Sequence, residues 1–233
     1  MFAVIFEVQP RKDCRQAYLE LAKQLKPKLE AIDGFIDNER FASQGNEGRL
    51  LSLSTWRDEK AVVRWRTHGE HHAVQEKGRF QVFEDYRIRV GEITSDNRPP
   101  KGIRVEEQRF DATEIGEAKA CTVTEISPGA RSPQGLGPGS LLEHLKLDAR
   151  AAGLVDHDVY ESIYNPGKLL VLGSWRDAEA ASAWAPTPFE GAAAIRHRQV
   201  RVIRDYGMFD RREAPQYYRE VERGSPARSA PVA

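Results

Sequence analysis

The stretch "LLSLSTWRDEKAVVRW", Leu50 to Trp65, returns 119 residues later as "LLVLGSWRDAEAASAW", Leu169 to Trp184. Extended outward, the match pairs residues 34–65 with residues 153–184 without a gap, and 13 of these 32 positions are identical. Chance would give roughly two identities at average residue usage. The chain of 233 residues therefore carries one domain twice, and each copy has a common domain size.

Composition excludes several classes of partner. Lys plus Arg and Asp plus Glu balance at 35 each, so the chain has no basic field that would attract nucleic acid or an anionic membrane surface. No run approaches the roughly 18 apolar residues that a membrane span requires. The two cysteines, Cys14 and Cys121, occupy positions that do not correspond in the two copies, which argues against a disulfide framework. We therefore expect a cytoplasmic protein.

The first copy shows the order βαββαβ. Strand-like runs occur at residues 2–9, 34–43, 48–56 and 80–93, and the Gly- and Asn-containing "QGNEG" joins the second and third as a hairpin. Helical spacing of apolar residues covers the segment that ends at Gly34. Asp58 is the predicted N-cap of a second helix, which we expect to break near Thr67. This order is the ferredoxin-like arrangement.

Apolar residues lie on both sides of the predicted strands, so both faces of each sheet must be buried away from water. Helices cover one face, and the other must meet a second sheet. We therefore predict an α+β fold in which two βαββαβ units, fused in tandem, pack sheet on sheet as an intramolecular dimeric α+β barrel around a closed, water-poor chamber. The expected boundaries are a first domain at 1–95, a linker at 96–117, a second domain at 118–212 and a tail at 213–233. The Gly-, Pro- and Ser-rich stretch 127–140 is expected to form a mobile loop.

A family resemblance rests on these residues. "VIFEVQP", "IDGFIDNERF", "GRLLSLSTWRDEKAVVRWRTHGEHHAVQEKGR" and "DYRIRV" in the first unit resemble the antibiotic biosynthesis monooxygenase (ABM) domain of the dimeric α+β barrel superfamily. "GLVDHDVYESIYNPGKLLVLGSWRDAEAASAW" and "VRVIRDYGMFDR" in the second unit are similar to the same domain. The resemblance implies a monooxygenase that oxidises a small aromatic or phenolic molecule, quinol- or anthrone-like, with O₂ and without a cofactor.

Such chemistry needs a base, hydrogen-bond donors for an oxyanion and aromatic walls. The candidate catalytic residues are His72, His71, Trp65, Asn38 and Tyr86. The candidate substrate-binding residues are Trp65, Arg79, Phe41, His157, Tyr160 and Trp184. A histidine is the preferred base because imidazole titrates near neutral pH.

Some of these candidate residues also have a purely structural interpretation. Trp65 and Trp184 are also expected as packing residues that fix the second helix of each unit to its sheet. His157 replaces Asn38 in the second unit, so either the two pockets differ in role or both side chains face solvent.

Histidines on the second predicted helix raise the possibility of a metal or haem site. His68, His71 and His72 share one helix face, but no matching ligand set occurs elsewhere in the unit, so no metal site is expected. The haem-degrading members of the superfamily couple an Asn on the first strand with a Trp and a His on the second helix, and Trp65 alone matches that pattern. A haem-binding or haem-degrading protein is therefore an alternative.

The second unit departs from the first after Trp184. Pro186 and Pro188 shorten its second helix, so we expect its pocket to be altered or absent and the first unit to keep the functional one. The remaining alternative is a non-catalytic small-molecule-binding or stress-response protein that uses the same fold. Further association of the chain into a homo-oligomer is left open.

Overall fold

The computed structural model describes residues 1–129 and 137–223, so the centre of the Gly-rich stretch and the end of the tail lie outside the described residues. The first unit contains β1 (Phe2–Pro10), α1 (Arg15–Glu30), β2 (Phe35–Ser43), β3 (Leu50–Trp56), α2 (Glu59–Arg66), α3 (Gly69–Lys77), the π-helical turn η1 (Gly78–Val82) and β4 (Phe83–Asp96). The second contains β5 (Ala120–Pro128), α4 (Pro138–Leu145), β6 (Leu154–Ser162), β7 (Leu169–Trp175), α5 (Ala178–Ser182) and β8 (Ala192–Gly207).

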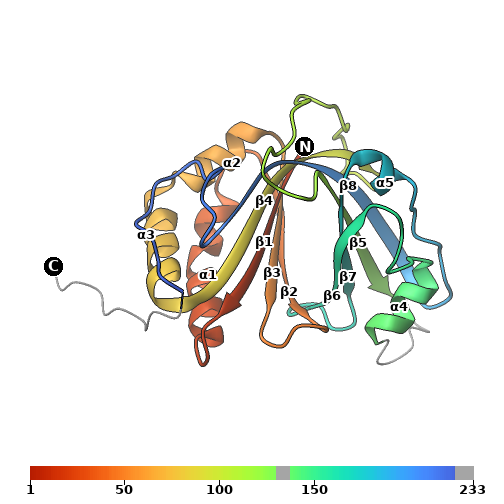
Figure 1. Ribbon diagram of the computed structural model, residues 1–233, viewed down its shortest axis with the longest axis horizontal. Coiled ribbons are helices and arrows are strands. Elements are labelled where there is room, and N and C mark those ends of the chain that lie inside the picture. The colour runs from red at the N-terminus through yellow and green to blue at the C-terminus, as the bar shows by residue number, and fades with distance from the viewer. Residues whose placement is uncertain (130–136, 224–233) are drawn as a thin grey trace.

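Eight antiparallel strands close into a barrel in the order β1-β3-β2-β6-β7-β5-β8-β4. Each unit contributes a four-stranded ferredoxin-like sheet, and the two sheets are joined edge to edge by β2 with β6 and by β4 with β8. Helices α1, α2 and α3 cover the outside of the first sheet, and α4 and α5 flank the second (Figure 1). The predicted pseudo-dimeric α+β barrel is thereby confirmed, and the closure leaves neither sheet with an unpaired edge.

The contacts between the two units obey an approximate two-fold symmetry. The Ser43 hydroxyl donates to the Asp158 carboxylate at 2.8 Å, and Ser162, its repeat equivalent, donates to Glu39 at 2.5 Å. The same two carboxylates accept the side-chain amides of Asn46, at 3.0 Å, and Asn165, at 2.6 Å. Reciprocal contact of this kind is the signature of a two-fold interface. It gives a structural reason for the serine and asparagine identities in the repeat.

The barrel interior contains a second reciprocal pair of contacts. Arg89 forms an ion pair with Glu7 of its own unit and donates to the Ser174 hydroxyl of the other unit at 2.7 Å. Arg198 forms an ion pair with Glu125 of its own unit and donates to the Thr55 hydroxyl of the other unit at 3.0 Å.

Both interior glutamates remain ionised. Burial raises the pKa of Glu7, but Arg89 and the Tyr160 hydroxyl more than offset this effect and the pKa ends below its usual value. Burial likewise raises the pKa of Glu125, and Arg198 with Lys168 lowers it further than burial raises it. Each buried charge is therefore paired with an opposite charge of its own unit, as ions in a protein interior must be.

Apolar side chains fill the rest of the barrel interior, where the sequence predicted a chamber. Phe41, Leu51 and Leu53 of the first unit meet Tyr160, Leu170 and Leu172 of the second, and all six are nearly or completely inaccessible to solvent. The linker residues Ile103 and Val105 pack against this cluster. The expected chamber between the sheets is therefore replaced by a packed core, because the pleat aims large side chains from both units inward.

Helix two of the first unit is divided as predicted. Asp58 caps α2 by accepting the Ala61 amide at 2.8 Å, and the Thr67 hydroxyl donates to the carbonyl oxygen of Val63 where α2 ends. In the second unit Asp177 caps α5 in the same way, but α5 ends at Ser182 and the chain from Trp184 to Phe189 is not helical. Within the described ranges, no helix is both long and apolar enough to cross a membrane.

The interior ion pairs make a prediction about stability. Arg89→Met leaves Glu7 buried without its cation, so we expect the free energy of unfolding to fall by about 3 kcal/mol in chemical denaturation. Arg57→Met is the matched control, since Arg57 pairs with Asp33 at the exposed surface and such pairs contribute little. Equal stabilities for the two variants would contradict the structural importance of the interior pair.

Candidate functional site

A cavity of about 170 Å³ lies on the helix-covered face of the first unit. Strands β1 to β4 form its floor, α1, α2 and α3 cover it, and Tyr206 of β8 contributes one side chain from the second unit. Its apolar walls include Phe6, Tyr18, Leu25, Phe83 and Val90. Because strand side chains alternate between faces, these residues and the barrel core lie on opposite sides of the same sheet.

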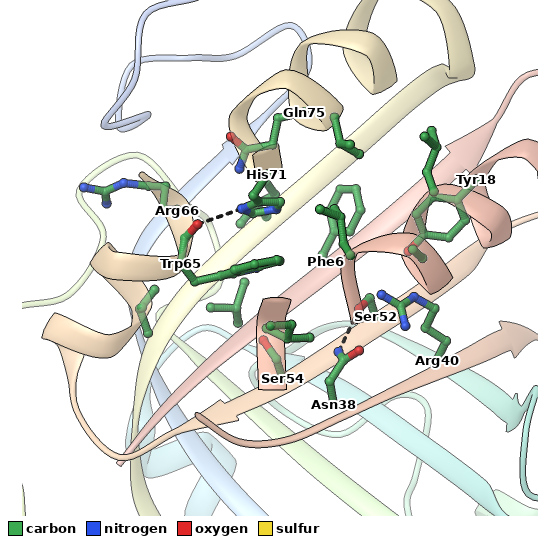
Figure 2. Close-up of a pocket in the computed structure, with 18 of the residues that line it drawn as sticks. Phe6, Tyr18, Asn38, Arg40, Ser52, Ser54, Trp65, Arg66, His71 and Gln75 are labelled. Atoms are coloured by element: carbon green, nitrogen blue, oxygen red, sulfur yellow. Dashed lines mark hydrogen bonds between the residues drawn. The ribbon is translucent and has the colours of Figure 1, made fainter. Parts of the chain in front are cut away.

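Polar side chains of two neighbouring strands form one part of the floor. Asn38 pairs with Ser54, and Arg40 pairs with Ser52, in the antiparallel register of β2 and β3. The Asn38 amide donates to the Ser52 hydroxyl at 3.0 Å and to the carbonyl oxygen of Leu53 at 2.9 Å (Figure 2). These two bonds hold the Asn38 side chain in one orientation at the cavity wall.

Trp65 and His71 stack at the roof of the cavity. Their ring centroids are 4.0 Å apart with an interplanar angle of 14°. His71 Nδ1 lies 2.9 Å from the carbonyl oxygen of Trp65, and because a carbonyl only accepts, Nδ1 carries the proton (Figure 2). Burial lowers the pKa of His71 to about 4, so the ring is neutral at pH 7 and its Nε2 is free of a proton. The break between α2 and α3 is what lets His71 fold back over Trp65.

His72 lies outside this cavity. Its exposed ring stacks on Tyr218 with centroids 5.4 Å apart, and its Nδ1 is 3.1 Å from the Tyr218 hydroxyl. The same hydroxyl donates to the side-chain oxygen of Gln75 at 3.0 Å. Of the two preferred histidines, the structure therefore places His71 at the cavity and His72 at the contact with the C-terminal segment.

Arg79 and Tyr86 also belong to that contact. Arg79 is 2% exposed and donates to the carbonyl oxygen of Met208 at 2.7 Å and to the Tyr86 hydroxyl at 3.0 Å. Arg211 donates to the same hydroxyl at 3.0 Å. Neither Arg79 nor Tyr86 lines the cavity, although the Tyr86 ring contacts its wall through Phe6, with centroids 5.8 Å apart.

The other candidate residues lie farther from the cavity. Phe41 and Tyr160 belong to the barrel core, where the Tyr160 hydroxyl donates to Glu7 at 2.9 Å. His157 is half-buried on β6 opposite Gly173. Trp184 is buried in the second unit, where it stacks on Trp175.

The second unit fills the space that corresponds to the cavity. The Trp184 indole donates to the carbonyl oxygen of Leu145 at 3.3 Å, and its ring packs with Leu141, Leu142 and Val159 in one apolar cluster. The floor residues Asn38, Arg40, Ser52 and Ser54 have His157, Val159, Val171 and Gly173 as repeat equivalents. The two units therefore have sheets of the same topology, but only the first has this cavity.

Several lining residues were not among the sequence candidates: Tyr18, Arg40, Ser52, Ser54, Arg66 and Gln75. A signal for the strand residues exists, because Asn38, Arg40, Ser52 and Ser54 are polar positions that alternate with the core-facing Phe41, Leu51 and Leu53. Tyr18 and Gln75 carry no comparable signal, since each is one polar residue among many on its helix.

Two expectations concern bound groups. Within residues 1–129 and 137–223, no three His, Cys, Asp or Glu side chains cluster as metal ligands. His71 Nε2 is the cavity atom that would ligate a haem iron. A cavity of about 170 Å³ is small beside the roughly 300–1,000 Å³ of pockets for drug-sized ligands, so a porphyrin does not fit between these side chains as they stand.

Comparison with known proteins identifies relatives of this chain. The family model described as antibiotic biosynthesis monooxygenase matches residues 1–77. "Jasmonate monooxygenase ABM" of Pyricularia oryzae is 42% identical over 223 residues, which cover 94% of this chain and 98% of the relative. "Uncharacterized protein YqjZ" of Bacillus subtilis is 33% identical over 93 residues, covering 40% of this chain and 78% of the relative.

One solved structure shares the overall arrangement. An aldoxime dehydratase crystallised with butyraldoxime superposes with a TM-score of 0.54 at 13% identity, covering 87% of this chain and 79% of the dehydratase chain. At that identity the similarity concerns the fold alone.

The buried histidines make a prediction about pH. The pKa of His71 is lowered by burial to about 4, and that of His197 is lowered to about 4 by burial and by Arg198. The unfolded chain therefore binds more protons than the folded one between about pH 6.5 and 4, and the stability present above pH 6.5 is lost as the pH falls through this window. We expect each histidine to cost about 1 to 3 kcal/mol of unfolding free energy by pH 4.

The measurement is denaturant unfolding at several pH values for the wild type and His71→Gln. The variant should show a smaller loss of stability between pH 6.5 and 4. His144→Gln, at an exposed site on α4, is the control and should keep the wild-type pH dependence. An unchanged pH dependence in His71→Gln would show that the ring is charged or solvated in the folded protein.

Proposed function

Because the chain belongs to the antibiotic biosynthesis monooxygenase family and is a monooxygenase of that type, we propose that its reaction takes place in the cavity of the first unit, without a prosthetic group. One observation carries this proposal. The first unit keeps an apolar cavity with a neutral imidazole stacked on Trp65, whereas the second unit fills the corresponding space with Trp184 and leucines.

The first candidate substrate is jasmonate or a similar small acid. The relative named jasmonate monooxygenase matches nearly the full length of this chain. Jasmonate combines a carboxylate with a cyclopentanone ring and an apolar side chain, and the cavity combines mostly apolar walls with a polar floor at Asn38, Arg40 and Ser52. A small apolar molecule with one anionic end suits this distribution.

A phenolic, quinol- or anthrone-like molecule is the second candidate. Phe6, Tyr18, Trp65 and Phe83 line the cavity and offer aromatic surfaces for a flat ring. Oxidation of an anthrone-like CH₂ group by O₂ breaks two C–H bonds, forms C=O and releases the second oxygen atom as water, so it needs no added reductant. Hydroxylation of one jasmonate C–H bond also consumes O₂, but it requires two further electrons from a reductant.

The chain's own residues would contribute three effects to either reaction. Apolar and aromatic walls exclude water from the reacting atoms. Donors at the floor, the guanidinium of Arg40 and the hydroxyl of Ser52, stabilise negative charge on a substrate oxygen. His71 Nε2 accepts a proton or a hydrogen bond, and its low pKa suits a substrate whose proton is already acidified by a neighbouring carbonyl or by the floor donors.

Activity should distinguish the two neighbouring histidines. We expect His71→Gln to lower kcat by roughly 10²- to 10⁴-fold, the range for loss of a positioned acid–base group, and His72→Gln to retain nearly full activity. Oxygen uptake is measured with jasmonate and with an anthrone, each with and without NADPH. Uptake with the anthrone alone would support the second candidate, and NADPH-dependent uptake with jasmonate the first. Ligand binding without any uptake would favour a non-catalytic binding protein.

The two repeated tryptophans should respond differently to substitution. Trp65→Ala opens the cavity and removes the His71 stack, so we expect ligand affinity and turnover to fall. Trp184→Ala removes packing in the second unit and should lower the unfolding free energy by about 3 kcal/mol while ligand affinity at the first unit is kept. Calorimetric binding and thermal unfolding report the two effects. Equal loss of binding in both variants would contradict a site that lies under the helices of the first unit.

A further inference from the structure

We propose that Arg40 is the residue that binds the carboxylate of the substrate and thereby sets its orientation in the cavity. This inference rests on the proposed function of the cavity and goes beyond it by naming the charged group of the substrate and the side chain that recognises it.

The Arg40 side chain extends from β2 along the cavity floor toward Ser52, its partner in the strand register (Figure 2). Its Nε atom is buried and makes no hydrogen bond, and its guanidinium has no carboxylate partner among the described residues. Arg79, Arg89 and Arg198 are fully buried, and each donates through its guanidinium to carbonyl, hydroxyl or carboxylate oxygens, although the Nε atoms of Arg89 and Arg198 also lack a hydrogen bond. Arg40 is half-buried at the cavity, and its guanidinium forms no hydrogen bond or ion pair with the described residues.

An unused buried donor of this kind destabilises a protein unless something else binds it. The fold itself does not require the arginine, because the repeat equivalent of Arg40 is Val159, which is 2% exposed and packs in the apolar cluster of the second unit. The second unit forms the equivalent strand with a valine at this position, so the sheet does not need a charged side chain here. The arginine of the first unit therefore indicates a ligand that supplies a hydrogen-bond acceptor.

The surroundings of Arg40 favour a carboxylate in particular. Guanidinium presents its N–H groups in a planar fork that matches the two oxygens of a carboxylate. The Ser52 hydroxyl accepts the Asn38 amide hydrogen, so its own hydrogen is available to a ligand oxygen. An anion at this floor would therefore receive donors from both Arg40 and Ser52.

This position of the anion fixes the direction of the rest of the molecule. Trp65 and His71 lie at the roof, on α2 and α3, whereas Arg40 and Ser52 lie on the floor strands (Figure 2). A substrate held by its acid group at Arg40 places its apolar body against Phe6 and Trp65, toward His71. Arg66 also lines the cavity and its Nε is likewise buried without a hydrogen bond, but its guanidinium points away from Asn38 and Ser52 (Figure 2).

The test compares jasmonic acid with its methyl ester, which has nearly the same shape but no charge. Calorimetric binding is measured for the wild type, Arg40→Met, Arg40→Lys and the control Arg64→Met, an exposed arginine of α2 that pairs with Asp33 outside the cavity, with circular dichroism to confirm that each variant is folded. We expect the wild type to bind the acid roughly tenfold or more tightly than the ester. Arg40→Met should lose this preference with ester binding unchanged, Arg40→Lys should restore part of it, and Arg64→Met should keep it.

A wild type that binds acid and ester equally, or an Arg40→Met variant that loses both equally, would overturn the inference. The same comparison is made with 4-hydroxybenzoate and its methyl ester. If neither acid is preferred over its ester in a way that depends on Arg40, the inference is also overturned. Oxygen uptake separates this outcome from failure of the proposed function. Acid binding that depends on Arg40, without oxygen uptake, would support the inference and contradict the enzymatic function. Oxygen uptake without a preference for the acid would support the enzymatic function and contradict the inference.

Discussion

The structure depends on two buried arginines that each bond to both halves of the chain. Arg89 and Arg198 each pair with a glutamate of their own unit and donate to a hydroxyl of the other, so separation of the units would break both of these hydrogen bonds. A hydrogen bond from a charged group contributes roughly 1.5–3 kcal/mol, and its loss opposes a relative shift of the two sheets. The serine and asparagine contacts where β2 meets β6 form a second set of reciprocal contacts between the two units.

Because the reciprocal contacts lie inside the barrel and at its edges, the outer faces of the two sheets are free to differ. The first unit covers its outer face with α1, a helix of 16 residues, and with α2 and α3, which leave a cavity. The second covers it with the shorter α4 and α5 and fills the space with Trp184. One half of a nearly symmetric scaffold thus provides a site, and the other provides the partner sheet that the first needs.

Much of the fold could be predicted from residues whose physical role is local. Asp58 caps its helix, Thr67 lies at the break in helix two, and the two prolines after Trp184 end the second copy of that helix. The cavity was harder to predict, because it required knowing which face of each strand meets the helices. Phe41 and Tyr160 were expected at the substrate, yet the pleat aims them into the barrel core, while Arg40 and Ser52 face the cavity.

The repeated sequence by itself predicted two ferredoxin-like units that pair, since 13 identities over 32 residues give one strand pattern twice and apolar residues on both faces of each sheet need cover. It also identified Trp65 as a site candidate. Only the tertiary structure decided between His71 and His72. Successive residues of a helix point about 100° apart, so the packing of α3 beside α1 and α2 stacks the first ring on Trp65 and leaves the second to Tyr218.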